Sequence, residues 1–127
     1  MIFDSHAHYD DQQFDIDREE LLQSLPELGV GTVVNVSASC DSWKRCVEMA
    51  AQYPYIYAAV GTHPDEIGGL NEESFAEMIE WCKKDKVVAI GEIGLDYYWD
   101  NHPHDVQKYW FIRQLDLARE MNLPVII

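Results

Sequence analysis

Short apolar runs alternate with helical patterns along the whole of this chain. Runs rich in β-branched residues occupy positions 2–4, 32–37, 56–60 and 87–90, and a fifth begins in the closing stretch LPVII at 123–127. Strands that are apolar almost throughout are typical of parallel sheets, which are buried on both faces and need helical crossovers. The alternation therefore predicts an α/β fold in which parallel (βα) units follow one another.

Helix signals fall between these strands. Asp17 can cap the first helix, and Glu20 three residues later completes a pattern like a capping box. Asn71 can cap the third helix, in which apolar side chains recur at the spacing of one buried stripe. The helices are expected from about 17 to the glycines at 29 and 31, from 41 or 42 to near 53, from 72 to 82, and from about 104 to 121.

Two arrangements of such units are open, a doubly wound sheet and a (βα) barrel. No glycine-rich phosphate loop follows the first strand, which weakens the dinucleotide-binding form of the doubly wound sheet. Four (βα) units and a fifth strand amount to half of a (β/α)8 TIM barrel, which typically needs about 250 residues. We therefore expect residues 1–127 to form a single domain, the N-terminal half of a TIM barrel that is truncated after strand five.

Charge and cysteine content limit the functions open to the chain. Its formal net charge of −14 argues against a broad electrostatic grip on nucleic acid, which needs lysine and arginine against phosphate. A small acidic site that holds metal ions is compatible with a phosphodiester substrate, because cations then face the phosphates. The three cysteines show no CxxC spacing, which favours buried free thiols. The sequence has neither a signal-peptide pattern nor a membrane-spanning run, so a cytoplasmic protein with no membrane partner is expected.

Two histidines flank a single alanine in FDSHAHYD at 3–10, directly after the start of the first strand. The side chains of His6 and His8 project from the same face of a strand, with Cα atoms roughly 6.5 to 7 Å apart. Two imidazoles at this spacing can bind one metal ion. An HxH pattern also occurs by chance, and its position directly after the first strand of a (βα) series is what favours the metal site.

The working face of a barrel lies at the carboxyl ends of its strands. That rule gathers His6 and His8 after the first strand, His63 after the third, and Glu92 with Asp96 after the fourth. Two imidazoles and a carboxylate suit zinc, manganese, iron or a similar divalent ion, which lowers the pKa of bound water to about 7. A second ion a few ångströms away would let Glu92 bridge the pair.

The other histidines and the tryptophans have simpler explanations. His102 and His104 flank a proline just before a helix and are expected to be solvated or capping residues. For His63, a hydrogen bond within its own loop competes with a role in the site. The tryptophans at 81, 99 and 110 are expected to serve packing.

Four stretches of the chain together resemble the TatD family of metal-dependent deoxyribonucleases, which belongs to the amidohydrolase-like TIM-barrel enzymes. They are FDSHAHYD at 3–10, GTHP at 61–64, GEIGLDYY at 91–98 and LPVII at 123–127, so the resemblance covers the whole chain in register. It implies a barrel hydrolase that acts on phosphodiester bonds with two divalent metal ions, for which Mg²⁺, Mn²⁺ and Zn²⁺ are the candidates.

The resemblance also implies roles by position. His6 and His8 would bind the first metal, and Glu92 would bridge both metals as the catalytic residue. His63 would bind substrate at the mouth of the site, and Asp96 would support it. The family's remaining ligands, two histidines and an aspartate, come from strands five, six and eight, so a second chain or a C-terminal half would have to complete the barrel.

Three functions are compatible with these observations. The leading hypothesis is a deoxyribonuclease or exonuclease that hydrolyses DNA by metal-activated water. The second keeps the barrel and the metals but acts, like other amidohydrolases, on a small amide, ester or phosphoester, which the low content of nine lysines and arginines mildly favours. The third is an inactive half-barrel domain that pairs with a partner through its open edge strands.

Overall fold

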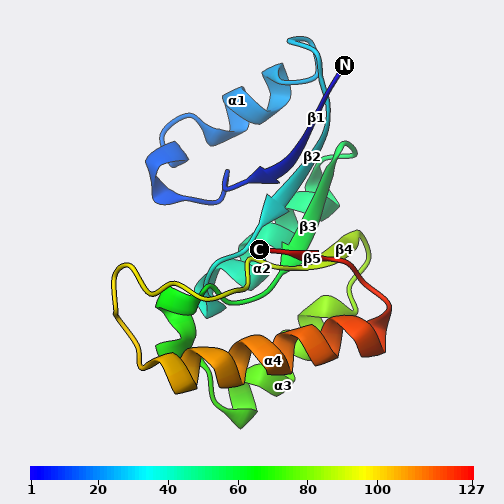
Figure 1. Ribbon diagram of the computed structural model, residues 1–127. Helices are drawn as coiled ribbons and strands as arrows, with labels where there is room; N and C mark the ends of the chain where they lie inside the picture. Colours follow the sequence, from blue (N-terminus) through cyan, green and yellow to red (C-terminus); the bar gives the residue numbers. More distant parts are fainter.

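The structure, a computed structural model, describes all 127 residues. Five strands alternate with four α-helices and two short 3-10 helices (Figure 1). No helix is both long enough and apolar enough to cross a membrane. The strands are β1 (Ile2–Ala7), β2 (Val30–Val36), β3 (Ile56–Val60), β4 (Val87–Gly91) and β5 (Val125–Ile126); the helices are η1 (Gln12–Phe14), α1 (Arg18–Ser24), α2 (Cys40–Gln52), η2 (Pro64–Gly69), α3 (Glu72–Cys82) and α4 (His104–Met121).

All five strands are parallel, and they lie in the sheet in the order in which they occur along the chain. A doubly wound sheet needs a point where the strand order reverses, and this sheet has none. Sequential order, with an α-helix after each of the first four strands, is the arrangement of a (βα) barrel. The predicted fold is therefore confirmed: the chain forms about half of such a barrel.

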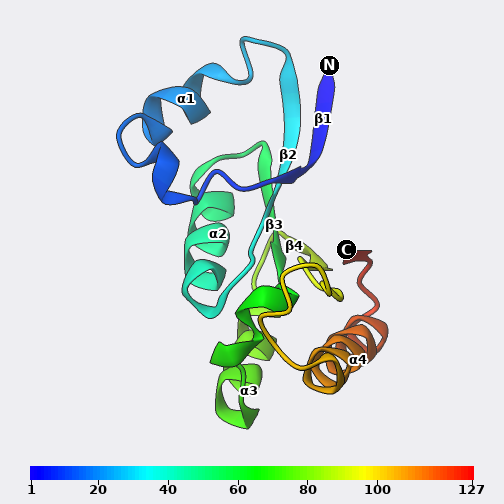
Figure 2. The same cartoon turned by 60° about the vertical axis from the view of Figure 1, so that its left-hand side comes forward.

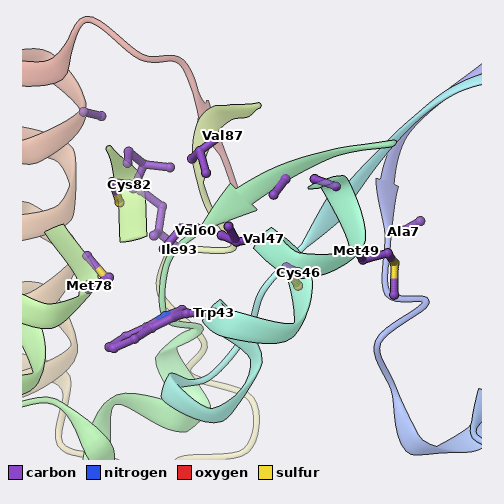
Figure 3. Packing of buried hydrophobic residues seen from close by; sticks show 14 of the residues in the cluster. Ala7, Trp43, Cys46, Val47, Met49, Val60, Met78, Cys82, Val87 and Ile93 are labelled. Carbon is purple, nitrogen blue, oxygen red and sulfur yellow. The ribbon is translucent and has the colours of Figure 1, made fainter. Parts of the chain in front are cut away.

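The larger hydrophobic core lies where the helices pack on the sheet, and it contains 23 buried residues. Figure 3 shows the side chain of Trp43, on α2, pointing toward the helix α3 that carries Met78. The indole Nε1 of Trp43 donates a hydrogen bond to the carbonyl oxygen of Gly61 at 2.9 Å. The core therefore also fixes the carboxyl end of β3, from which the loop with His63 departs.

The opposite face of the sheet carries a smaller cluster of four buried residues, Val34, Val36, Ala59 and Ala89. Alternation along β2 explains why there are two clusters, because Val33 belongs to the helix-covered core and its neighbour Val34 to the smaller one. Figure 2 shows α1 and α2 together on one side of the first three strands. Both faces of β2 are buried, as the continuous apolar run predicted.

Helix starts differ in detail from the sequence patterns. Asp17 precedes α1, but its side chain makes no capping hydrogen bond, so the predicted pairing with Glu20 as a capping box is wrong. Helix α2 begins at Cys40, one residue earlier than expected. The hydroxyl of Ser42 accepts a hydrogen bond from the backbone N–H of Ser39 at 3.0 Å. This hydrogen bond caps the first turn of α2, so the helix begins before Asp41.

The segment GTHPDE, predicted to be a loop, contains the start of the 3-10 helix η2. His63 is its N-cap residue, and Pro64 stands at the first helical position. Proline suits that position because its fixed φ matches a helix and its missing N–H would have no partner there. The side chain that caps this helix is therefore the same one predicted to contact substrate.

Candidate metal centre

His6, His8 and Glu92 converge at the carboxyl ends of β1 and β4. His6 Nε2 lies 3.2 Å from Glu92 Oε2, and His8 Nε2 lies 3.4 Å from the same oxygen. The two imidazole rings meet edge to face with centroids 5.0 Å apart. One potential ligand atom from each of the three residues lies within 4.8 Å of the other two. The alternation of β1 and the barrel rule thus brought together residues 86 positions apart, as the sequence predicted.

The proton position on His8 is determined by its backbone partner. His8 Nδ1 lies 2.8 Å from the carbonyl oxygen of Val36, which can only accept a hydrogen bond, so Nδ1 carries the proton. In the neutral ring, Nε2 then turns a lone pair toward the carboxylate of Glu92. Two lone pairs at this separation repel each other unless a proton or a cation lies between them.

The contact between His8 and Glu92 shifts the pKa values of both residues. The hydrogen bond with Glu92 raises the pKa of His8 above its ordinary value, against the opposing effect of burial. The hydrogen bond with His8 lowers the pKa of Glu92 to about 2, again against the effect of burial. Glu92 is therefore an anion throughout the neutral range, with its charge directed at two imidazoles.

This donor set fits a divalent cation. Two imidazole nitrogens and one carboxylate oxygen are ligands used by zinc, manganese and iron. Histidines that bind metals commonly donate their other ring N–H to a backbone carbonyl, and His8 does so to Val36. The fit rests on the lone pair of His8 Nε2 and the charge of Glu92, which converge on one point.

Buried hydrogen bonds hold the backbone of Glu92 in place. Its N–H donates to the carbonyl oxygen of Ser37 at 2.7 Å. The hydroxyl of Ser37, which is fully buried, accepts the N–H of Gly61 at 2.9 Å. A Cβ atom on Gly61 would lie 2.8 Å from backbone atoms of Gly91, so only glycine permits this approach of β3 to β4. Ser37 was not identified from the sequence, where nothing distinguishes it from any other serine that ends a strand.

His63 faces the other oxygen of the carboxylate. Its Nε2 lies 3.8 Å from Glu92 Oε1, which is too far for a hydrogen bond. Its Nδ1 accepts the backbone N–H of Asp65 at 3.0 Å, so that nitrogen carries no proton and Nε2 does. The loop contact that competed with a site role for His63 is thus present, and it leaves an N–H group directed at the site.

A second group of potential ligands lies beside the first. One ligand atom each from His63, Asp65 and Asp96 falls within 4.8 Å of the other two. Asp65 Oδ1 is buried without a hydrogen-bond partner, while Asp96 Oδ1 accepts the N–H of Tyr98 at 3.0 Å. Because His63 Nε2 carries a proton, this nitrogen has no lone pair for a cation. The carboxylates of Asp65 and Asp96 are therefore the groups that could bind a cation here.

The remaining histidines pack more closely than predicted. His102 Nε2 lies 3.1 Å from the carbonyl oxygen of Asp65, so it joins the loop before α4 to η2. His104 stacks on Tyr97 with ring centroids 3.6 Å apart. The predicted solvated or capping role is wrong for His102, which contacts the segment that carries Asp65 of the second group.

An open cleft of about 450 Å³ leads to the first group. His8 and Glu92 line it together with residues of the segment after β1 that includes η1, of the end of the β2–α2 connection and the start of α2, and of η2. The lining residues from these three segments are Asp10, Asp11, Gln12, Gln13, Ala38, Ser39, Ser42, Arg45 and Glu66. Arg45 was missed from the sequence, because no pattern there shows which cation of a helix faces a site.

Comparison with known proteins gives a consistent result. The model of the family described as "TatD related DNase" matches residues 3–127. The uncharacterized metal-dependent hydrolase YabD of Bacillus subtilis is 44% identical over 127 residues, which are all of this chain and 50% of the relative. The 3'-5' ssDNA/RNA exonuclease TatD of Cronobacter sakazakii is 31% identical over 126 residues, which are 99% of this chain and 48% of the relative.

Solved structures agree on the fold. The crystal structure of YjjV, a TatD homologue from Escherichia coli, superposes with a TM-score of 0.86 at 33% identity, covering 98% of this chain and 49% of that one. The TatD family hydrolase from Entamoeba histolytica gives a TM-score of 0.88 at 25% identity, covering 98% of this chain and 48% of the other. The chain spans about half the length of the relatives it matches.

Proposed function

The chain belongs to the TatD family, and from this membership we propose that it supplies part of the active site of a metal-dependent hydrolase that cleaves phosphodiester bonds in DNA. The observation that carries the proposal is the convergence of His6, His8 and Glu92, in which two imidazole nitrogens lie 3.2 and 3.4 Å from one carboxylate oxygen. Residues 1–127 would act as one domain, the N-terminal half of the complete barrel.

His6 and His8 would hold the first divalent ion with Glu92 Oε2. Glu92 Oε1 lies 3.8 Å from His63 Nε2 without a hydrogen bond between them, and Glu92 would bridge the first ion to a second. Mg²⁺, Mn²⁺ and Zn²⁺ are the candidate ions. When bound, such ions activate water and stabilise the charge that develops on phosphate oxygens.

The chain's own residues would then position the substrate. His63 presents Nε2–H toward the carboxylate, and we propose that this N–H donates a hydrogen bond to a phosphate oxygen. Glu92 keeps its charge at neutral pH because its pKa is about 2, so it needs no deprotonation before binding a cation. The N–H of Gly61 donates to the hydroxyl of Ser37 and the N–H of Glu92 donates to its carbonyl oxygen, so Ser37 holds the ends of β3 and β4, and with them His63 and Glu92.

DNA is the proposed substrate because of the relatives. The Cronobacter protein carries the name of an exonuclease acting on single-stranded DNA and RNA. YabD, which is more similar to this chain, is named only as a metal-dependent hydrolase. The low content of nine lysines and arginines mildly favours the second candidate, a hydrolase of small amides, esters or phosphoesters.

The test uses the complete protein and the variants Glu92→Gln and Glu73→Gln. Both remove one carboxylate charge, but Glu73 is exposed in the first turn of α3. With Mn²⁺ or Mg²⁺ present, we expect Glu92→Gln to lower digestion of a single-stranded oligonucleotide by about a hundredfold or more. Glu73→Gln should retain activity within about twofold.

Two further measurements separate the alternatives. Calorimetric titration of Mn²⁺ should show weaker binding to Glu92→Gln than to either the wild type or Glu73→Gln. Turnover of small carboxylic esters and amides by the wild type, with no turnover of oligonucleotides, would overturn the nuclease proposal in favour of the second candidate. Full nuclease activity of Glu92→Gln would remove this residue from the mechanism.

A further inference from the structure

Arg45 is an unpaired cation in the cleft that leads to Glu92. It lies on α2, it is exposed, and its guanidinium forms neither an ion pair nor a hydrogen bond with another residue. It is also the only lysine or arginine among the residues that line the cleft. We propose that Arg45 binds a phosphate of the substrate that neighbours the phosphate being hydrolysed. This inference rests on the proposed nuclease function.

The aspartates of the cleft have other partners. Asp10 is 7% exposed, and its Oδ1 accepts a hydrogen bond from Asn35 Nδ2 at 3.0 Å. Asp11 Oδ1 accepts the N–H of Gln13 at 2.8 Å and caps η1. Arg18 donates to the backbone carbonyls of both aspartates. These contacts fix the loop after β1 and occupy its two aspartates, and Glu66, which also lines the cleft, forms no ion pair with Arg45.

The chemistry of the cleft suits an extended phosphodiester. A guanidinium offers a planar fork of donors that matches two oxygens of one phosphate. Gln12 and Gln13, on the same cleft, have side-chain amides without hydrogen-bond partners and add neutral donors. In a chain with a net charge of −14, the overall field does not attract nucleic acid, so a local contact of this kind would contribute much of the affinity.

A substrate with only one phosphodiester cannot use such a contact. Bis(p-nitrophenyl) phosphate would therefore be hydrolysed at the metal centre without any interaction with Arg45. A single-stranded oligonucleotide places a second phosphate beyond the scissile one. The two substrates, assayed on the same protein, separate the role of the cleft from that of the metal centre.

The experiment compares Arg45→Gln, Arg45→Lys and Lys44→Gln in the complete protein. Lys44 is the matched control because it precedes Arg45 on α2, lies 3.7 Å from Glu48 and does not line the cleft. For Arg45→Gln we expect KM for the oligonucleotide to rise about tenfold, with kcat unchanged. In this variant, the slope of log KM against the logarithm of the salt concentration should be smaller by about 0.7. Kinetics on bis(p-nitrophenyl) phosphate should stay unchanged.

The other variants complete the test. Arg45→Lys should keep the wild-type salt dependence but give an intermediate KM, because it restores the charge without the fork. Lys44→Gln should match the wild type on both substrates. An unchanged oligonucleotide KM in Arg45→Gln would overturn the inference while nuclease activity persists, and so would an equal loss on both substrates. A wild-type protein that hydrolyses neither substrate would overturn the proposed function, and the role of Arg45 with it.

Discussion

His8 and His63 face different oxygens of one carboxylate, that of Glu92, with their ring protons on opposite nitrogens. A backbone carbonyl, that of Val36, accepts from Nδ1 of His8, whereas a backbone N–H, that of Asp65, donates to Nδ1 of His63. The neutral rings therefore present a lone pair in the first case and an N–H in the second. The neutral ring of His8 can therefore bind a cation, whereas that of His63 can donate a hydrogen bond to an anionic oxygen.

In the metal-free protein, the contact between His8 and Glu92 should stabilise the fold within a limited pH range. The contribution of Glu92, whose pKa is lowered to about 2, is present above the ordinary carboxyl value of 4.5 and is lost as the pH falls toward 2. The contribution of His8, whose pKa is raised, is present below 6.5 and is lost as the pH rises through the raised value.

We therefore expect the free energy of unfolding of the wild type to exceed that of Glu92→Gln most between about pH 4.5 and 6.5. Urea denaturation with a chelator present would measure it, with Glu73→Gln as the control whose difference from the wild type changes little with pH. A difference that is largest at pH 9 would contradict the assignment.

Affinity for divalent ions should fall as the pH is lowered. A proton on His8 Nε2 occupies the lone pair that a cation needs, and the contact with Glu92 raises the pKa at which that proton binds. We expect the Kd for Mn²⁺ to rise about tenfold per unit below that pKa. Calorimetric titration at pH 8, 7 and 6 measures this, with His104→Asn as a control that keeps wild-type affinity. Equal affinities at pH 8 and 6 would exclude His8 as a ligand.

Replacing Asn35 should lower the free energy of unfolding. Asn35 is fully buried, its Oδ1 accepts the N–H of Tyr9 at 2.7 Å, and its Nδ2 donates to Asp10 Oδ1. Asn35→Leu leaves the buried carboxylate of Asp10 and the partly buried N–H of Tyr9 without these partners, at an expected cost of about 2–4 kcal/mol in the free energy of unfolding. Asn101→Leu, at an exposed position, should change it by less than about 0.5 kcal/mol. Equal losses would show that Asn35 has no special role.

Ser37→Ala should have a moderate effect on stability. It leaves the buried N–H of Gly61 without the hydroxyl that accepts it, at a cost of about 1–3 kcal/mol. Ser24→Ala removes a hydroxyl that donates only to Leu21 O, a carbonyl that also accepts from Leu25, and should cost less than about 1 kcal/mol. Thermal denaturation of both variants gives the comparison, and a smaller loss for Ser37→Ala would contradict this account.

The fold could largely be predicted because local patterns determine it. The bounds of β3, α3 and α4 follow the apolar periodicity and the cap at Asn71. His6 and His8 followed from the twofold alternation of a strand, and Glu92 from the rule that strand ends share one face of a barrel. Each of these inferences needs only residues close in sequence or the topology of the sheet.

The rest depended on contacts that no local pattern encodes. The proton on His8 is set by a carbonyl 28 residues away, and Ser37 acts through Gly61 and Glu92, which follow two other strands. Arg45 lines the cleft because of the rotation of α2 about its own axis, which is fixed by the packing of Trp43 rather than by the charge pattern. Side-chain and backbone hydrogen bonds at long range therefore define the site more finely than the motifs do.

The contact between His6 and Glu92 joins the ends of β1 and β4, two strands that are not neighbours in the sheet. In a flat sheet, three strand spacings of about 4.8 Å would put β1 and β4 about 14 Å apart. The side chains of His6 and Glu92 nevertheless meet at 3.2 Å, in keeping with the inward curvature of a barrel sheet. A cation bound by residues at the ends of both strands would hold the sheet in its curved form. Release of the cation would therefore change the shape of the sheet as well as the charge of the site.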